Sequence, residues 1–358
     1  MRILCLPKYD EMGASSRLRT YQYACELRKQ GFTVDIEPLF DSQYLAKKYS
    51  GRRPVLEVVG SYGGRLMRLC SNRKYEIVWA EKELLPWVPP VIERSLTPRN
   101  PKFVVDYDDA IFHNYDRHRS KLVRSLLNCK IDDVMSRSDM VLAGNKYLAE
   151  RASLAGSSRI EYLPTVIDLE RYSKGIQVRE KLDSDRPLTI GWIGSPATAH
   201  YLDNLTFVAK KLQERYSVRF IAVGARPDQV AGTPFEAVQW TEDTEVMSLQ
   251  SIDIGLMPLI DGPWERGKCG YKLIQYMGCS LPVVASPVGV NIEIVKHGRN
   301  GFLARTDDDW ENALSLLIDD PILRKSMGES GRKLVENVYS LQAQAPRLTS
   351  MLGSLISD

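Results

Sequence analysis

The stretch from Arg266 to Ser286, RGKCGYKLIQYMGCSLPVVAS, places cations and glycines directly before an apolar helical pattern. Gly267, Lys268, Gly270 and Lys272 precede or open this helix. The N-terminus of a helix carries partial positive charge on its backbone N–H groups, so the segment would attract an anion such as phosphate. The alternative is an ordinary connection between a strand and a helix that carries surface lysines.

Carboxylates close another apolar strand pattern. The expected strand from Phe103 to Tyr107 ends in Asp106, Asp108 and Asp109. Three interpretations stay open here. A carboxylate could accept or orient the proton of a substrate hydroxyl. Asp106 and Asp108 could hold Mg²⁺ or Mn²⁺ on a diphosphate. Asp109 could instead cap the next helix, and a short acidic motif does not decide between these roles.

Small residues follow the first strand of each half of the chain. After the strand at residues 2–6 the loop contains Gly13, Ser15, Ser16 and Arg17, and after the strand at residues 188–193 it contains Gly194 and Ser195. Doubly wound folds bind ligands at this carboxyl edge, so both loops are candidate binding loops, the second through backbone contacts to phosphate. The first loop is not GxGxxG, and its alternative role is a turn that caps a helix through Ser15 or Ser16.

Apolar strand patterns alternate with amphipathic helix patterns along the chain. The expected strands are residues 2–6, 32–36, 77–80, 103–107, 140–143 and 160–164, followed by 188–193, 219–223, 237–240, 254–257 and 282–285. This order predicts an α/β protein with two Rossmann-like, doubly wound domains that face a central cleft. The domains are expected at 1–172 and 186–340, with a charged linker at 173–187 and a final helix at 341–358 that packs back on the first domain.

Composition excludes several protein classes. The 358 residues are 44% hydrophobic and 26% charged, as in a soluble globular protein. No run of about 18 apolar residues offers a membrane span, and the N-terminus is typical of a first strand rather than a signal peptide, so we expect a cytoplasmic protein. The six cysteines show no CxxC spacing, and we expect them to be reduced and mostly buried, without zinc.

A basic amphipathic segment runs from Lys47 to Lys74, with Glu57 as its single acid. Its cations are Lys47, Lys48, Arg52, Arg53, Arg65, Arg68, Arg73 and Lys74. Such a segment could rest on anionic lipid, each nearby cation contributing about 1 kcal/mol. A solvated helix face is the alternative, and nucleic acid is a weaker third choice because no nucleic-acid-binding motif accompanies the charge.

Taken together, these motifs resemble glycosyltransferase family 4, retaining enzymes of the GT-B architecture, over nearly the whole chain. The most specific part is YKLIQYMGCSLPVVASPVGVNIEIV followed by HGRNGFLA. It is similar to the family's donor-site helix, its G-x-P-V-V strand and the glycine-containing loop before an E-I-V helix. GASSRLRTYQY, DYDDAIF, LPTVID and IGWIGSPATAHYL resemble a subgroup of that family with a KCxxKLxQY-type donor loop.

The chain departs from the family pattern in the stretch that carries the resemblance. The family usually has two glutamates separated by seven residues, and Gly267 and Gln275 stand at their positions here. Glutamine can still hydrogen-bond a ribose diol without a charge, and Glu265 lies two positions from the first site. The family's histidine at the end of the acidic strand aligns with Asp108, and His113 is the candidate to replace it.

The resemblance implies transfer of a sugar from a nucleotide-diphosphate sugar to an acceptor hydroxyl, in polysaccharide or glycoconjugate synthesis and with lipid-linked acceptors included. Asp108 and Asp109 are then expected to orient the acceptor, while Arg266 and Lys272 stabilise the leaving diphosphate. No metal would be required, because the cations do its work. The expected donor-binding residues are Gly194, Ser195, Gly224, Trp240, Lys268, Cys269, Gly270, Tyr271 and Gln275.

Other functions stay open at this point. The missing glutamates are compatible with a protein of the same fold that binds a nucleotide sugar without catalysis, and a sugar-nucleotide epimerase shares the architecture. A nicotinamide oxidoreductase is disfavoured because GxGxxG and its downstream acid are missing. The expected partners are a nucleotide-sugar donor, a glycan or lipid-linked acceptor and an anionic membrane surface, and no nucleic acid.

Overall fold

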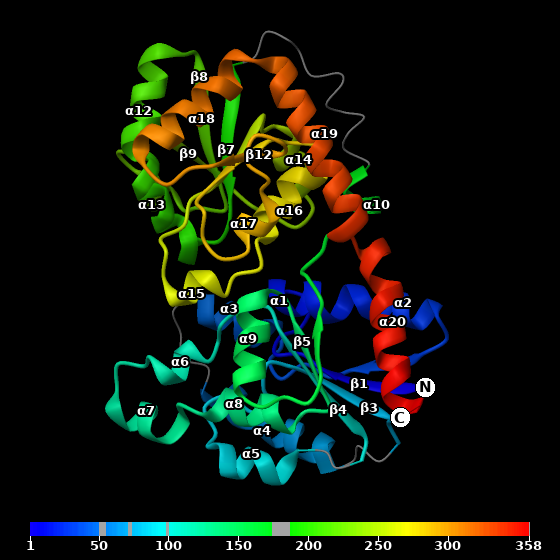
Figure 1. Ribbon diagram of the computed structural model, residues 1–358. Coiled ribbons are helices and arrows are strands. Elements are labelled where there is room, and N and C mark those ends of the chain that lie inside the picture. The colour runs from blue at the N-terminus through cyan, green and yellow to red at the C-terminus, as the bar shows by residue number, and fades with distance from the viewer. Residues whose placement is uncertain (50–54, 71–73, 98–99, 174–186, 358) are drawn as a thin grey trace. The chain divides into compact units, whose positions relative to one another are not determined.

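The computed structural model describes residues 1–49, 55–70, 74–97, 100–173 and 187–357, which form two compact units (Figure 1). The first unit contains Met1–Thr165, Gly267–Cys269 and Gln344–Asp358, and the second contains Val166–Arg266 and Gly270–Ala343. The boundary lies at residue 165 rather than at the predicted 172. The reason is that Ile167 donates to Tyr339 O at 3.1 Å and accepts from Leu341 N at 2.9 Å, which ties it to the second unit. Residues 174–186 of the predicted linker lie outside the described residues.

The first unit is built on a six-stranded parallel sheet in the order β2-β1-β3-β4-β5-β6. Its strands are β1 (Arg2–Leu6), β2 (Thr33–Ile36), β3 (Ile77–Glu81), β4 (Lys102–Tyr107), β5 (Met140–Ala143) and β6 (Ile160–Tyr162). Its helices are α1 (Ala14–Ser16), the π-helical η1 (Arg17–Tyr21), α2 (Gln22–Lys29), α3 (Ser42–Tyr49), α4 (Val55–Cys70), α5 (Pro90–Leu96), α6 (His113–Asp116), α7 (Lys121–Leu127), α8 (Lys130–Arg137) and α9 (Lys146–Leu154).

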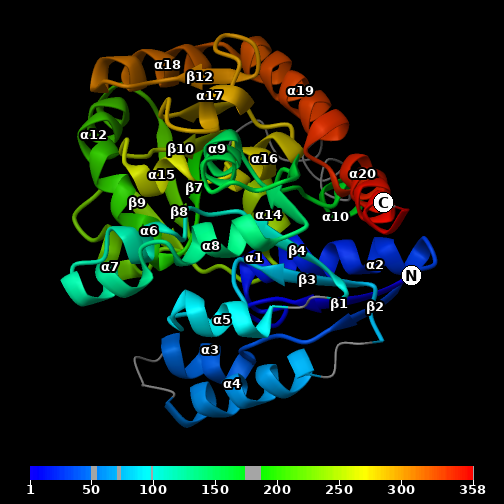
Figure 2. The same cartoon turned by 60° about the horizontal axis from the view of Figure 1, so that its bottom comes forward.

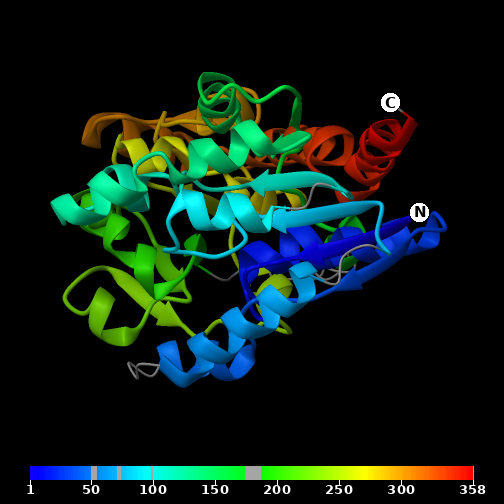
Figure 3. The same ribbon diagram turned by 90° about the horizontal axis from the view of Figure 1, so that it is seen from below.

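Helices cover both faces of this first sheet. Figure 2 shows α2 on one face and α4 with α5 on the other, and Figure 3 shows the same unit from below. A strand covered on both faces must be apolar throughout, and residues 3–6 of β1 are fully buried. Polar residues are therefore confined to the ends of the strands, and folds of this type bind ligands at the carboxyl ends.

The second unit has a six-stranded parallel sheet in the order β12-β11-β10-β7-β8-β9. Its strands are β7 (Leu188–Ile193), β8 (Val218–Val223), β9 (Phe235–Val238), β10 (Ile254–Met257), β11 (Val283–Ala285) and β12 (Gly301–Leu303). Its helices are α10 (Leu169–Ser173), the 3-10 helix η2 (Pro196–Leu205), α12 (Thr206–Arg215), α13 (Pro227–Val230), α14 (Glu245–Gln250), α15 (Pro263–Arg266), α16 (Tyr271–Gly278), α17 (Asn291–Ile294), α18 (Asp307–Asp319) and α19 (Pro321–Val338). The last helix, α20 (Leu341–Ser357), begins in this unit and continues into the first.

Alternation along the strands divides the second core into two layers. Ile221 and Val223 of β8 pack into one cluster with α16, whereas Phe220 and Ala222 pack into the other with α12 and α18. Successive side chains of a strand point to opposite faces, so a sheet covered on both sides needs apolar residues at every position. The predicted class, an α/β protein of two doubly wound domains, is confirmed.

The strand predictions differ from the structure by two residues at most, but the first helix differs more. The helical stretch begins at Ala14, directly after Gly13, and not near residue 18. It passes through the π-turn η1, which includes the buried Arg19. The predicted loop is therefore mostly helical, and its residues are held against the ends of neighbouring strands.

Helices α3 and α4 lie in the predicted basic segment, and the four cations of this segment whose side chains the structure describes all have partners. Arg65 is buried and donates to Pro7 O at 3.0 Å and Glu37 O at 3.1 Å, and burial lowers its pKa to about 10. Three further cations form ion pairs, Lys47 with Glu57, Arg68 with Glu37 and Lys74 with Asp35. The exposed side chains of α4 include Val59, Leu66 and Met67. The side chains of Lys48, Arg52, Arg53 and Arg73 lie outside the described part.

Two further expectations concern bilayers and thiols. Over the described ranges, no helix is long and apolar enough to cross a membrane. None of the six cysteines forms a disulfide, but only half are buried: Cys5, Cys269 and Cys279 are buried, and Cys25, Cys70 and Cys129 are exposed. The prediction that most of them are buried is therefore wrong.

Candidate functional site

The carboxyl end of β4 meets a buried lysine in the first unit. Lys82, directly after β3, places its ammonium 2.8 Å from Asp108 Oδ1 and donates to Ser15 Oγ at 2.9 Å. Ser15 in turn donates to the other oxygen of Asp108. Burial alone would raise the pKa of Asp108, but the charge of Lys82, together with Arg19, lowers it below the ordinary value. Asp108 is therefore a fixed anion at the edge of the sheet.

Asp106 has a different neighbour. Arg19 of η1 and Asp106 are both buried, and the guanidinium lies 2.6 Å from Asp106 Oδ1 and 3.1 Å from Oδ2. Arg19 also donates to Leu163 O at 2.8 Å. A bidentate arginine accounts for both carboxylate oxygens, so this structure gives Asp106 a structural role instead of the alternative role as a metal ligand with Asp108.

Asp109, like Asp106, has a raised pKa in the acidic segment. Burial first, and the neighbouring charge of Asp108 second, raise its pKa from 3.8 to about 6, while Lys82 and Lys268 oppose the shift. In the described ranges no side chain donates a hydrogen bond to its carboxylate. The predicted alternative as a helix cap is wrong, because α6 has Phe112 at its N-cap and no side-chain cap. Its carboxylate can therefore accept a hydrogen bond from a ligand hydroxyl.

The small residues of the first loop support these acids. Ser16 Oγ donates to Glu81 Oε2 at 2.5 Å and accepts from Tyr9 N at 3.0 Å. The N-cap of α1 is Gly13, without a side-chain cap, so the alternative of a cap through Ser15 or Ser16 is wrong. A Cβ at Gly13 would lie 2.5 Å from Tyr9 Cβ, so the tight turn requires glycine. Arg17 is partly exposed and reaches Glu11 O at 3.4 Å.

The loop Gly267–Cys269 belongs to the first unit, although its chain neighbours belong to the second. Asn145, the N-cap of α9, donates to Gly267 O at 2.9 Å and Lys268 O at 3.0 Å, and Cys269 Sγ donates to Asp108 O at 3.1 Å. Burial raises the pKa of the Cys269 thiol, so it acts here as a buried donor. The loop brings Lys268 close enough to lower the pKa of Asp109.

Gly267 explains one departure from the family pattern. A Cβ at this position would lie 2.3 Å from Ala110 Cβ and 2.8 Å from Ala110 N. No side chain fits there, least of all a glutamate. The close approach of this loop to the residue after Asp109 therefore requires glycine.

In the second unit, Gly194, Gly224 and Lys272 gather at the carboxyl ends of β7 and β8. Ile193 and Val223 are paired in register, and Gly194 N donates to Val223 O at 2.9 Å. A Cβ at Gly224, whose φ is +86°, would lie 2.1 Å from Gly194 O. The Lys272 ammonium lies 4.2 Å from the centre of the Trp192 ring and 2.8 Å from where a Cβ of Gly194 would be.

This arrangement suits a phosphate group. Lys272 lies in the first turn of α16, and Gly270 at φ +67° forms its N-cap. A helix N-terminus, an ammonium and two glycines at strand ends together give positive charge and backbone access without side-chain obstruction. Ser195 is exposed at the N-cap of η2, and Tyr271 is partly buried against the core of this unit.

Gln275 and Trp240 take part in a buried hydrogen-bond network. Gln275 is only 2% exposed and donates to Tyr172 Oη at 3.0 Å, and Tyr172 donates to Glu245 Oε1 at 2.9 Å. The Trp240 indole donates to Glu245 Oε2 at 3.0 Å. The amide of Gln275 is thus engaged inside the protein in this structure, and its predicted contact with a ribose has no geometric support.

Other predicted residues have partners away from these clusters. Arg266 is exposed, with its guanidinium 2.7 Å and 3.1 Å from the carboxylate oxygens of Asp261. Both ring nitrogens of His113 are engaged at 2.9 Å, one with Asp116 and the other with the Tyr147 hydroxyl. Of the described residues, no group of three His, Cys, Asp or Glu side chains could hold a metal ion.

Sequence reasoning missed Lys82, Arg19 and Asn145. Lys82 follows β3 as the aspartates follow β4, so the same rule of strand ends could have found it. Arg19 and Asn145 gave no such signal, because one looks like an ordinary helical cation and the other like an N-cap. Their partners lie 87 and 122 residues away.

Comparison with known sequences finds partial likenesses. The family model described as glycosyl transferases group 1 matches residues 187–320. The capsular polysaccharide biosynthesis glycosyltransferase CapM of Staphylococcus aureus is 25% identical over 150 residues, 40% of each chain. An alpha-1,3/1,6-mannosyltransferase ALG2 from Rhizomucor pusillus is 34% identical over 87 residues, 24% of this chain and 19% of the relative. The chain thus spans at most two fifths of the length of these relatives.

Solved structures show the same fold over the whole chain. A sucrose-phosphate synthase from Thermosynechococcus elongatus has a TM-score of 0.74 at 14% identity and covers 100% of both chains. HepE from Anabaena, solved with UDP-glucose, has a TM-score of 0.71 at 15% identity, over 99% of this chain and 100% of that one. These likenesses confirm the predicted GT-B type of fold.

Proposed function

We propose that this chain is a retaining glycosyltransferase of family 4, which transfers a sugar from a nucleotide-diphosphate sugar to an acceptor hydroxyl in glycan or glycoconjugate synthesis. The observation that carries the proposal is the group of Gly194, Gly224 and Lys272 at the strand ends of a domain that matches glycosyl transferases group 1. CapM and ALG2 are named as enzymes that transfer sugars, and HepE was solved with UDP-glucose.

The second unit would bind the donor. Its diphosphate would lie against Lys272, the N-terminus of α16 and the backbone of Gly194, and its base near Gly224 and Trp240. As the bond between sugar C1 and the diphosphate oxygen breaks, negative charge develops on the leaving group. A preorganised ammonium and aligned N–H groups stabilise this charge, an effect that contributes most in many enzymes.

The first unit would orient the acceptor. Asp109, with a pKa of about 6, is mainly ionised at neutral pH and can accept a hydrogen bond from the attacking hydroxyl. The acceptor oxygen bonds to C1 on the face that the diphosphate leaves, and the hydroxyl proton passes to an oxygen of the leaving diphosphate. Asp108, fixed by Lys82 and Ser15, would bind a second hydroxyl of the acceptor.

A metal is not required in this proposal, because Lys272 and the helix terminus supply positive charge at the diphosphate. The measurement is turnover of the donor in the presence of a chelator, which should leave the rate unchanged. Complete loss of turnover that Mn²⁺ restores would reverse this part of the proposal.

The test of the whole proposal is a thermal-shift screen with UDP, GDP, ADP and dTDP, followed by a donor-hydrolysis assay with the matching nucleotide sugars. One nucleotide should raise the melting temperature. Lys272→Ala should lower turnover about 100-fold, as expected when a transition-state donor is lost, whereas Lys210→Ala on the exposed side of α12 should not. Unchanged binding and turnover in Lys272→Ala would show that the donor site is wrongly assigned.

A second candidate is a protein that binds a nucleotide sugar without transferring it. Two observations favour it, since Gly267 has no room for the family's first glutamate and Gln275 is buried at the position of the second. Tight nucleotide-sugar binding with neither hydrolysis nor transfer would identify this function.

A further inference from the structure

Trp87 is a large aromatic residue that is both exposed and held in an unfavourable backbone conformation. Its φ is +62°, in the left-handed region that bulky residues seldom adopt, and 52% of its surface is exposed. Such a conformation persists only where the surrounding structure enforces it, and it often marks a functional position. The structure shows what enforces it here.

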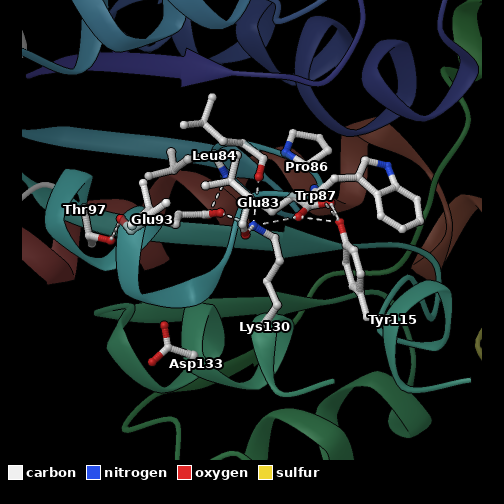
Figure 4. Close-up of polar contacts among 12 residues, drawn as sticks. Glu83, Leu84, Pro86, Trp87, Glu93, Thr97, Tyr115, Lys130 and Asp133 are labelled. Atoms are coloured by element: carbon white, nitrogen blue, oxygen red, sulfur yellow. Dashed lines mark hydrogen bonds and ion pairs between the residues drawn. The ribbon is translucent and has the colours of Figure 1, made fainter. Parts of the chain in front are cut away.

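A buried charge cluster fixes the loop that carries Trp87 (Figure 4). Lys130, which is fully buried, donates to Leu85 O at 2.8 Å and to Val88 O at 2.7 Å, and it also pairs with the buried Glu93. Its three N–H donors are thereby all used. Two carbonyls of the loop, one on each side of Trp87, are held by the same ammonium.

The carboxylates of this cluster hold the rest of the loop. Glu93 accepts from Leu84 N at 2.8 Å, and Glu83 accepts from the Tyr115 hydroxyl at 2.8 Å. The same hydroxyl accepts from the backbone N–H of Trp87 at 3.1 Å. The Lys130 ammonium also lies 3.3 Å from Glu83 Oε2, so direct contacts lead from Lys130 through Glu83 and Tyr115 to the Trp87 backbone and hold it in place.

Trp87 lies in the loop after the carboxyl end of β3, and doubly wound folds bind ligands at this edge of the sheet. Strand β3 lies beside β4 in the sheet, and Glu81 of β3 is in register with Asp106 of β4. Tyr115 lies in α6, which follows Asp109 in the chain. The segment after β3 thus carries both Lys82 and Trp87, and the segment after β4 carries both Asp109 and Tyr115, whose hydroxyl holds the Trp87 backbone. The Trp87 ring meets the Tyr115 and His118 rings at steep angles of 71° and 76°, with centres 5.1 Å and 5.7 Å apart, so neither ring stacks flat on it.

We propose that Trp87 is the platform on which the first unit binds a sugar ring of the acceptor. A pyranose has an apolar C–H face that packs on an aromatic plane, while its hydroxyls remain available for carboxylates such as Asp108 and Asp109. A rigid aromatic side chain loses little entropy on binding, which a preorganised site exploits. A bilayer surface would not require this fixed orientation. The inference rests on the proposed function, because it names the substrate class of the same unit.

The test is saturation-transfer NMR on the full chain, with irradiation of the aromatic protons. The probes are methyl α-glucoside, methyl α-mannoside and methyl N-acetyl-α-glucosaminide. Transfer to the ring C–H protons of at least one probe is expected for the wild type. It should fall at least about fivefold in Trp87→Ala and less in Trp87→Phe. Phe207→Ala, at a 65% exposed aromatic residue of the second unit, is the matched control and should not change the signal.

The supporting residue is tested separately. Tyr115→Phe keeps the ring but removes the hydroxyl that holds the Trp87 backbone, so the signal should be weakened but not lost. Thermal shift with the donor nucleotide shows that each variant is folded and that the second unit still binds. No transfer to any probe in the wild type, or full transfer in Trp87→Ala, would overturn the inference.

Two further outcomes separate the inference from its premise. Loss of binding to phosphatidylglycerol vesicles in Trp87→Ala, with the sugar signal unchanged, would overturn it and assign the indole to a membrane surface. A retained sugar signal in a chain that binds no nucleotide would contradict the proposed function, and the assignment of Trp87 as a sugar platform would stand.

Discussion

At the scale of single residues, Asp109 couples function to stability. Its pKa rises from 3.8 to about 6 because burial and Asp108 both disfavour its charge. The folded state thus holds this proton more tightly than the unfolded chain. The resulting stabilisation is full below pH 3.8 and is lost as the pH rises through about 6. The ionised form that the proposed reaction uses is therefore the destabilising form.

Asp109→Asn should separate these two effects. At pH 8 the variant should be more stable than the wild type by about 1 to 3 kcal/mol, because the buried charge is removed, and at pH 4 the two should be alike. In turnover, kcat/KM of the wild type should rise through pH 6, whereas the variant should be slow and lack this rise. Urea unfolding and a pH–rate profile measure both, and a variant that is equally stable at pH 8 would contradict the raised pKa.

Gly224 lies where β8 ends, and it has two reasons to be glycine. Its φ is +86°, and a Cβ would lie 2.1 Å from Gly194 O. Gly232 has a similar φ of +77° but open space around it. Gly224→Ala should therefore cost about 2 kcal/mol more stability than Gly232→Ala and should weaken nucleotide binding. Equal losses in the two variants, measured by urea unfolding, would mean that strain alone acts at Gly224.

At the scale of elements, the loop after β3 depends on its buried ammonium. Lys130→Met should destabilise the protein by about 3 to 5 kcal/mol at pH 7, because Glu83 and Glu93 would remain buried as uncompensated charges. The loss should be smaller at pH 4, because burial raises the pKa of Glu83, so this carboxylate takes up a proton as the pH falls. Lys121→Met, at an exposed position of α7, is the control and should change stability by less than about 0.5 kcal/mol. Chemical unfolding at both pH values gives the comparison.

The unit to which the loop Gly267–Cys269 belongs does not follow from its position in the sequence. The loop groups with the first unit, while the residues before and after it group with the second. Asn145 and the carbonyl of Asp108 account for this, because they bond to its backbone and its thiol. A mutation in this loop therefore acts on the acidic segment of the first unit as well as on α16.

At the scale of the whole molecule, the two units should respond differently to nucleotide. A ligand at 100 times its Kd stabilises the state that binds it by about 2.7 kcal/mol. With the nucleotide found in the screen, hydrogen exchange should slow near Gly194, Gly224 and α16, all of which belong to the second unit. Protection confined to β1 through β6 would place the nucleotide in the first unit and reverse the assignment of donor and acceptor.

Much of this fold could be predicted from the sequence, because local patterns determine it. Continuous apolar runs predicted every strand except β12, and the Gly270 and Lys272 pair correctly indicated the start of α16. Glycines and carboxylates at strand ends indicated the candidate site, since parallel strands bring their carboxyl ends to one edge. These features depend on neighbours within a few residues, which a single sequence displays.

Tertiary structure alone decided which charges are available and which are engaged inside the protein. Arg65 looks like a surface cation in the sequence but is buried, and Lys82 and Asp108 meet across neighbouring strands. Likewise, a glutamate cannot replace Gly267, because Ala110, far away in the sequence, fills the space that its side chain would need. Helical and strand periodicities report which face of an element is apolar but not what lies against it. The sequence by itself therefore determined the elements and the edge that carries the candidate site, and packing between distant segments determined the chemical state of each group there.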